Sequence, residues 1–163
     1  MRRRHLLPVL LATAGLALTA TPASAASGSL TDPRGDYPDI LKLAYSNAAS
    51  QVQMAMTYAS IADAQNESFY LAWGTAGARY QVFNSPSAGL RELRYYARTG
   101  APTQTVPCAG LKVVRRTELN RRTVTIPRSC LPKAAARLRF QGIATAGLSS
   151  IDSTKYSPLV ARG

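Results

Sequence analysis

The sequence predicts an all-β protein, an antiparallel β-sandwich of about seven or eight strands with one hairpin disulfide. Three observations lead to this fold class. Short runs in which apolar and polar residues alternate recur along the chain, and clusters of Gly, Pro, Ser and Asn separate them. Two of those runs, 69–73 and 80–83, are aromatic. Its only two cysteines, Cys108 and Cys130, stand at a spacing that suits a single hairpin.

The first two expected strands form a hairpin. Residues 40–45 place Leu41, Leu43 and Tyr45 on one face, and the run from Val52 to Tyr58 alternates again after a polar turn. The Ala- and Met-rich stretch 48–66 also fits one face of a helix. Strict alternation favours a strand here, followed by a loop or a single helical turn over 59–65.

The remaining strands follow at similar spacing. Short aromatic runs cover 69–73 and 80–83, and the sequence Gly-Thr-Ala-Gly separates them. A strand over 93–96 follows the breaker cluster 84–89, a hairpin spans 111–126, and the last strand covers 138–143. Breakers between short strands are typical of a sandwich of antiparallel sheets.

The cysteines suggest a register for the hairpin. If its turn centres on Leu119, three sets of residues face one another across it: Cys108 with Cys130, Val114 with Val124, and Arg116 with Arg122. An even number of cysteines in an exported chain indicates a structural disulfide. A redox or metal pair would require the tighter CxxC spacing or further ligands, which the sequence lacks.

Residues 1–25 have the pattern of a signal peptide. Arg2, Arg3 and Arg4 precede an apolar run over 6–20, and Ala23-Ser24-Ala25 forms the small-x-small site for cleavage after Ala25. The general secretory route is favoured, and the twin-arginine route is the alternative. We expect a secreted, extracellular protein with no stable membrane insertion once the signal is removed. Residues 26–38 then lead into one β-sandwich domain over 39–163.

The basic charge lies mainly in the second half of the chain. Loss of the signal removes three of the 20 basic residues and leaves 17 against eight acidic ones. Residues 26–78 hold five acidic and two basic side chains, whereas residues 79–163 hold three acidic and 15 basic ones. A basic surface of this kind attracts anionic partners.

Several catalytic classes are excluded by composition. His5 is the only histidine and leaves with the signal, so Ser-His-Asp and Cys-His catalysis and His-ligated zinc are ruled out for the mature chain. No serine stands three residues before a lysine, and the acids are dispersed. We therefore expect a protein that is not an enzyme and has no cofactor, with calcium as the one exception to consider.

The calcium candidates are the three carboxylates in the segment 32–39, namely Asp32, Asp36 and Asp39. Carboxylates and turn carbonyls are ligands that Ca²⁺ prefers. The alternative is that Asp before Pro or Gly simply forms turns that lead into the first strand.

The candidate polyanion-binding residues are four arginines on the expected hairpin: Arg115, Arg116, Arg121 and Arg122. Like charges that face one another across a hairpin destabilise it, and a bound polyanion would relieve that repulsion. Teichoic acid, nucleic acid and acidic polysaccharide are suitable ligands. The ordinary alternative is a solubilising, arginine-rich surface that protects edge strands.

Three motifs carry a resemblance to a known family: Asp32-Pro33-Arg34-Gly35-Asp36 with Asp39-Ile40, then 126–131 (IPRSCL), and the ending 160–163 (VARG). Together they resemble an uncharacterised family of small secreted proteins of high-GC Gram-positive bacteria. The resemblance implies a β-sandwich with one hairpin disulfide. The opening is also loosely similar to DOMON and family-9 carbohydrate-binding modules, and no ligand-binding residue transfers from them.

Taken together, these features predict a secreted, non-catalytic β-sandwich that binds an anionic or carbohydrate polymer through arginines of its C-terminal half. The alternative is a protein–protein interaction module or protease inhibitor that acts through an exposed loop such as 84–89.

Overall fold

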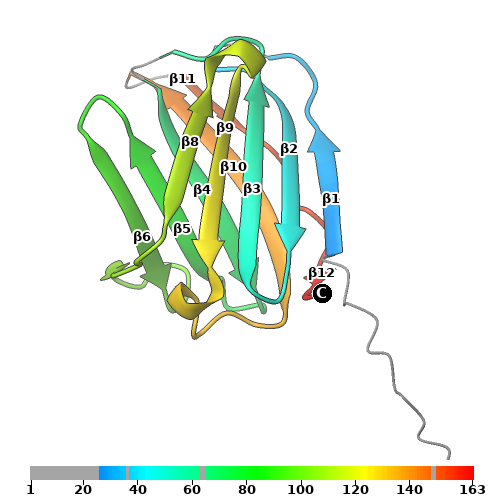
Figure 1. The fold of residues 1–163 in the computed structure, drawn as a ribbon, viewed down its shortest axis with the longest axis vertical. Helices are drawn as coiled ribbons and strands as arrows, with labels where there is room; N and C mark the ends of the chain where they lie inside the picture. Colours follow the sequence, from blue (N-terminus) through cyan, green and yellow to red (C-terminus); the bar gives the residue numbers. More distant parts are fainter. Residues whose placement is uncertain (1–25, 36, 63–64, 148–149) are drawn as a thin grey trace, which may run out of the picture.

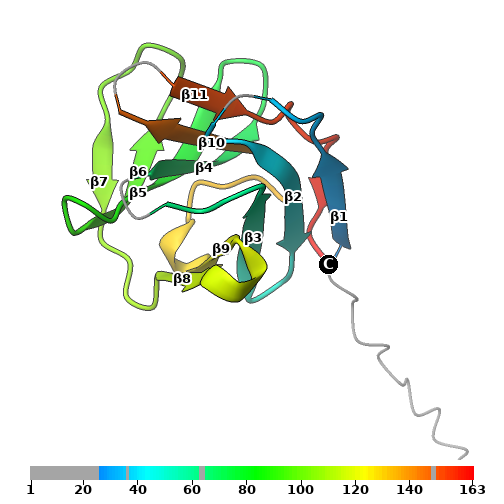
Figure 2. The ribbon, with the colours of Figure 1, turned by 90° about the horizontal axis from the view of Figure 1, so that it is seen from above.

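The computed structural model describes residues 26–35, 37–62, 65–147 and 150–163, so the expected signal peptide lies outside the described residues. The chain forms two antiparallel β-sheets packed face to face (Figures 1 and 2). The predicted all-β sandwich with one disulfide is therefore confirmed. Within the described ranges there is no α-helix, and hence none that could cross a membrane.

The first sheet has five strands in the order β1-β2-β3-β9-β8. Their bounds are Ala26–Thr31 for β1, Ile40–Asn47 for β2, Gln51–Tyr58 for β3, Arg121–Pro127 for β9 and Lys112–Arg116 for β8. The strand expected in the Ala- and Met-rich stretch is thus confirmed as β3.

The second sheet runs in the order β11-β10-β4-β5-β6-β7, and β12 pairs with β10 outside this path. The bounds are Ser150–Ser153 for β11, Arg137–Ala146 for β10, Asn66–Trp73 for β4, Ala78–Ser85 for β5, Leu90–Tyr96 for β6, Gln104–Val106 for β7 and Val160–Ala161 for β12.

Four strands are absent from the sequence-based expectation: β1, β7, β11 and β12. All four lie at sheet edges or pair along one side only, and three of them have four residues or fewer. The segment 26–38, expected as a lead-in, contributes β1 to the first sheet. Its Ser- and Gly-containing sequence has low intrinsic strand propensity, and pairing with β2 supplies the stabilisation.

The core lies between the two sheets and is built from the inward residues of every long strand. Leu43, Met54, Phe69 and Leu71 are among the side chains with at most 1% exposure. Burial of each such side chain contributes roughly 1.5–3 kcal/mol. Tyr45 and Phe140 stack across the interface with ring centroids 4.9 Å apart.

Gly142 of β10 is required for this close packing. Met56 of the opposite sheet occupies the space where a Cβ on Gly142 would lie. The two sheets can therefore approach each other this closely at Gly142 only because this position has no side chain.

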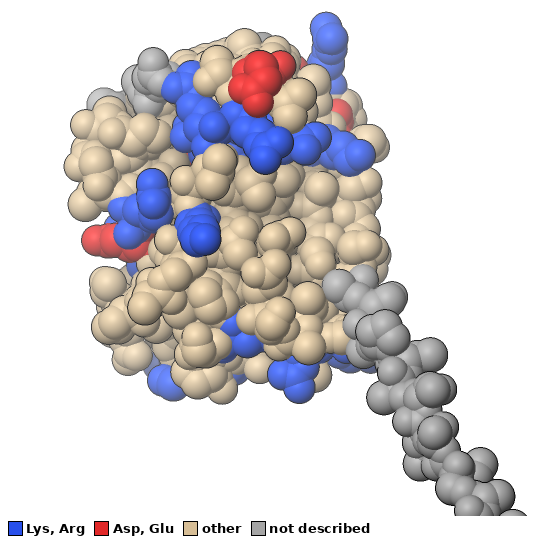
Figure 3. All heavy atoms as spheres, in the orientation of Figure 1, with Lys and Arg blue, Asp and Glu red and all other residues tan. Residues whose placement is uncertain are grey.

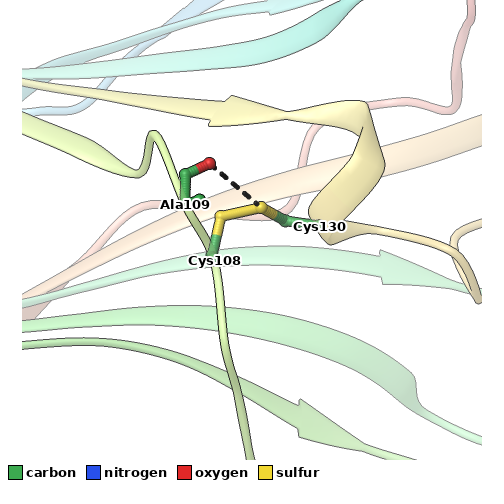
Figure 4. The surroundings of a disulfide bond; sticks show 3 residues. All are labelled: Cys108, Ala109 and Cys130. Atoms are coloured by element: carbon green, nitrogen blue, oxygen red, sulfur yellow. Dashed lines mark hydrogen bonds between the residues drawn. A yellow bond between two sulfur atoms is a disulfide. The ribbon is translucent and has the colours of Figure 1, made fainter.

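The disulfide joins Cys108 and Cys130, as predicted (Figure 4). Neither cysteine lies in a strand: Cys108 is in the connection from β7 to β8, and Cys130 ends the 3-10 turn Arg128–Cys130 after β9. The sulfur of Cys130 lies 3.8 Å from the carbonyl oxygen of Ala109. The bond thus attaches the segment that crosses between the sheets to the end of β9.

The expected register of the β8–β9 hairpin is wrong by one residue. In the structure Val114 pairs with Thr123 rather than Val124, and the arginines pair as Arg116 with Arg121 and Arg115 with Arg122. The cause is the turn. It has four residues, a 3-10 turn over Thr117–Leu119 followed by Asn120 in the left-handed region (φ 44°), rather than a turn centred on Leu119.

Candidate functional site

The four candidate arginines of the hairpin divide between two faces of the first sheet. Successive residues of a strand point to opposite faces. Arg115 and Arg122 share the inward face with Val124, whereas Arg116 and Arg121 point outward and are exposed. The structure therefore brings Arg116 and Arg121 together on one surface and separates them from the other two.

Arg122 is buried and paired with a carboxylate of the opposite sheet. Its Nε lies 2.9 Å from the carboxylate oxygens of Glu67 on β4. Glu67 also accepts hydrogen bonds from the Tyr58 hydroxyl at 3.2 Å and from Asn84 Nδ2 at 2.7 Å. The prediction that Arg122 is a solvated polyanion ligand is wrong, because its alternation with Val124 and Ile126 turns it into the core.

Burial has the largest influence on the pKa values of Glu67 and Tyr58 in this cluster. It raises the pKa of Glu67, although the charge of Arg122 and the hydrogen bonds from Arg122, Asn84 and Tyr58 act in the opposite direction. Burial, together with the adjacent Glu67, holds the pKa of Tyr58 well above its ordinary value. The cluster is therefore an internal polar contact between the sheets rather than a surface site.

Arg115 is also directed away from the outer face. Its Nη2 donates to the carbonyl oxygen of Ile61 at 3.2 Å, in the segment that follows β3. The side chain is half-buried. Arg115 thus connects the edge strand β8 to that segment.

The outward pair extends into a row that crosses the whole first sheet. Arg116 pairs with Arg121, Arg121 with Thr57, Thr57 with Lys42, and Lys42 with Thr31. Paired residues share a face, so the exposed Lys42 lies in line with the two exposed arginines, with Thr57 of β3 between Lys42 and Arg121. We call Lys42, Arg116 and Arg121 the cationic row. The alternation around Lys42 indicated that it points outward, but only the strand order shows its neighbours.

Two further rows lie on the outer face of the first sheet. One contains Val114, Thr123, Ala55, Ala44 and Ser29, and the other contains Lys112, Thr125, Gln53, Ser46 and Ser27. The three rows hold fifteen outward positions, of which four are basic and none is acidic. The row that contains Val114 carries only small or medium-sized side chains. A hollow of about 270 Å³ lies on this face, lined by Val114, Arg116, Arg121 and Thr123.

Figure 3 views this outer face. Basic side chains form a band across its upper part, where β8 ends and β9 begins in Figure 1, and an acidic group lies against this band. Smaller basic groups appear at the middle left and along the bottom of the view, and the surface between them is uncharged. The largest basic group in this view therefore lies at the end of the sheet that carries the hairpin turn.

The calcium candidates are only partly brought together. Burial raises the pKa of Asp32, and the nearby carboxylates of Asp152 and Asp39 raise it further, whereas Lys155 acts in the opposite direction. Asp39 is buried and accepts a hydrogen bond from the backbone of Gly35 at 3.1 Å. Asp36 lies outside the described residues, and the described ones contain no group of three or more side chains placed to hold a metal ion. The calcium site stays a prediction.

The loop considered as a protein-binding element is shorter than expected. Asn84 and Ser85 are buried at the end of β5, and Asn84 is a partner of Glu67. The exposed part is the turn 86–89, which a hydrogen bond from Gly89 N to Pro86 O closes at 3.1 Å. It forms the tip of the β5–β6 hairpin.

No family model matches this sequence, and no curated protein matches it. Function is therefore inferred from the charge and geometry of the chain itself. The outer face of the first sheet is the candidate site.

Proposed function

We propose that this protein is a secreted, non-catalytic binding module that holds an anionic polymer against the outer face of its first sheet. One observation carries the proposal: three rows of that face hold fifteen outward positions, with four basic and no acidic side chains, and three of the four cations share one row. Teichoic acid, nucleic acid and acidic polysaccharide are the ligand classes that fit.

The cationic row is suited to a polymer rather than to a single ion. Arg116 and Lys42 are three strand spacings apart, which is about 14 Å along the row. A chain with repeated negative charges can contact Arg116, Arg121 and Lys42 in turn. Its binding would also reduce the repulsion between the directly opposed Arg116 and Arg121.

The small side chains beside the cationic row support the same function. The second row contains only Val114, Thr123, Ala55, Ala44 and Ser29, so no bulky side chain prevents an extended polymer from lying on the sheet. Hydroxyls and small apolar groups can contact the uncharged parts of sugar or polyol units. The arginines supply the electrostatic contribution.

A binding role also agrees with the chemistry of the chain. Residues 26–163 contain no histidine. Glu67, whose pKa is raised by burial, is engaged by Arg122, Tyr58 and Asn84 inside the core. The signal-peptide pattern of residues 1–25 supports export to an environment where anionic wall polymers and polysaccharides occur.

The test compares two pairs of exposed arginines. R116Q/R121Q removes two charges from the cationic row, and the control R98Q/R137Q removes two exposed charges elsewhere. Binding of the mature chain to a short DNA duplex and to teichoic acid is measured by fluorescence anisotropy at several salt concentrations. For DNA, the slope of log K against log salt should flatten by about 2 in R116Q/R121Q.

The control variant should keep most of its affinity and its salt slope. Equal losses in the two double variants would overturn the proposal, because they would show attraction by net charge alone. Absence of measurable binding by the parent protein at low salt would also overturn it, and would favour a module that binds a protein partner.

A further inference from the structure

The outer face of the second sheet, on the opposite side of the sandwich, carries a different arrangement of arginines. Arg139 of β10 pairs with Ala72 of β4, and Ala72 pairs with Arg79 of β5. All three point outward, so two arginines stand on either side of one small residue. They line a hollow of about 240 Å³ with Ala72 at its floor.

Arg79 is held in a fixed orientation. Its Nη1 donates to the carbonyl oxygen of Gly77 at 3.2 Å, and its Cζ lies 4.3 Å from the ring centroid of Tyr96. The ring of Tyr70 lies 5.8 Å away on the same face. Stacking on aromatic rings restricts a guanidinium without neutralising its charge.

Among the described residues, no carboxylate forms an ion pair with either arginine of the hollow. The ion pairs in that part of the chain are Arg94–Glu92 and Arg122–Glu67, and neither includes Arg79 or Arg139. The described residues that line the hollow include no acidic side chain. Two guanidinium groups without a carboxylate partner among these residues therefore face the same small space.

Tyr156 provides an aromatic wall. The segment that follows β11 runs beside β10, where Thr154 N donates to Gly142 O at 2.9 Å and Ser157 N donates to Phe140 O at 2.8 Å. These contacts place Tyr156 next to the hollow, with its side chain partly exposed. Burial raises the pKa of Tyr156 and the charge of Arg79 lowers it, which agrees with the closeness of the two groups.

The remaining wall is the β4–β5 turn. Gly77 has φ +75° and lies against Thr99, whose N–H donates to Ala76 O at 3.0 Å. A side chain at Gly77 would be strained and would meet Thr99, so the turn keeps this shape only with glycine. Thr75 and Thr99 line the hollow on this side.

We infer that this hollow binds one sugar residue that bears a carboxylate or a phosphate. Arg79 and Arg139 hold the oxyanion, Tyr156 packs against the sugar ring, and threonine side chains contact its hydroxyls. Its volume is below the roughly 300–1,000 Å³ of pockets for drug-sized ligands and suits a single ring. The inference does not depend on the cationic row, with which the hollow shares no residue.

The test uses glucose 6-phosphate and glucuronic acid as probes. Inorganic phosphate and glucose are the controls, because phosphate is an anion without a sugar ring and glucose is a sugar without a charged group. Binding to the mature chain is followed by NMR chemical-shift titration. We expect both anionic sugars to bind more tightly than inorganic phosphate or glucose, with chemical-shift changes centred on Ala72, Arg79 and Tyr156. R139Q should raise the dissociation constants of both anionic sugars at least tenfold.

R137Q is the control, because Arg137 lies on the same strand two residues away, is exposed and does not line the hollow. It should change the dissociation constants by less than twofold. Y156A should weaken the anionic sugars and leave inorganic phosphate unchanged. R116Q/R121Q should leave sugar binding intact, which separates this site from the polymer-binding face.

Three outcomes would overturn the inference: no binding of either anionic sugar, equal losses in R137Q and R139Q, or shifts located away from the hollow. Inorganic phosphate that binds as tightly as glucose 6-phosphate would overturn the assignment to a sugar. A preference for one of the two anionic sugars would identify whether carboxylate or phosphate is the natural group.

Discussion

Arg122 of β9 and Glu67 of β4 form a buried ion pair that joins the two sheets, with Arg122 Nε 2.9 Å from the carboxylate. The side chains are 7% and 0% exposed. Tyr58 from the first sheet and Asn84 from the second donate to the same carboxylate. The pair therefore joins the two sheets, and loss of the cation would leave the carboxylate buried without its charged partner.

Removal of the cation should strongly destabilise the protein. R122M leaves the Glu67 carboxylate in the core without its charged partner, and we expect the free energy of unfolding to fall by about 3–5 kcal/mol. Urea denaturation of the mature chain provides the measurement. R116M is the control, because Arg116 is exposed, and should change stability by no more than about 0.5 kcal/mol.

The double variant R122M/E67L tests the same pair in a second way. It removes both charges, so we expect it to be more stable than R122M. If R122M unfolds at the same urea concentration as R116M, the ion pair does not hold the sheets together.

Glu67 should also make stability depend on pH. Its pKa in the folded protein is raised above the ordinary value of 4.5, so the folded state holds the proton more strongly than the unfolded state. The stabilising contribution of this group is therefore fully present below about pH 4.5 and is lost as the pH rises through the raised pKa. The stability of the wild type relative to E67Q should therefore fall as the pH rises above about 4.5.

Urea denaturation of both proteins, at pH values from below 4.5 upward, measures the difference in their free energies of unfolding. The contributions of titratable groups that the two proteins share cancel in this difference. A wild-type stability that rises with pH relative to E67Q would mean that Arg122 outweighs burial.

The disulfide should stabilise the fold through the crossover that it closes. The two cysteines are 22 residues apart, and a closed loop of that length contributes about 3 kcal/mol in the chain-entropy model. We expect C108A/C130A to remain folded with a melting temperature lower by roughly 10 °C. The wild type measured in reductant serves as the comparison, and an unchanged melting temperature in both would contradict the prediction.

Export should produce a chain that begins at Ala26. Cleavage after Ala25 retains all of β1, in which Ala26 pairs with Asn47 of β2. Intact-mass measurement of protein from the culture medium identifies the terminus. Full-length chain found only in the cytoplasm would refute both the cleavage site and the secreted function.

Much of the candidate site was accessible from the sequence, and one part of it was misassigned. The charge asymmetry and the basic hairpin are sequence properties, and Arg116 and Arg121 were among the predicted residues. The period of two through Arg122, Val124 and Ile126 already indicated that Arg122 points inward with the core. Charge alone predicts a surface role for Arg122, and the alternation of the strand contradicts that role.

The sequence by itself determined the all-β class, the long strands from β2 to β10 and the pairing of Cys108 with Cys130. These features follow from alternation, turn residues and cysteine number, which are local properties of the chain. Only the tertiary structure decided that Lys42 joins Arg116 and Arg121, that Glu67 lies against Arg122, and that Arg79 and Arg139 share one hollow. Each of these contacts depends on strand order, register or sheet packing, and those result from long-range burial rather than from any short stretch of sequence.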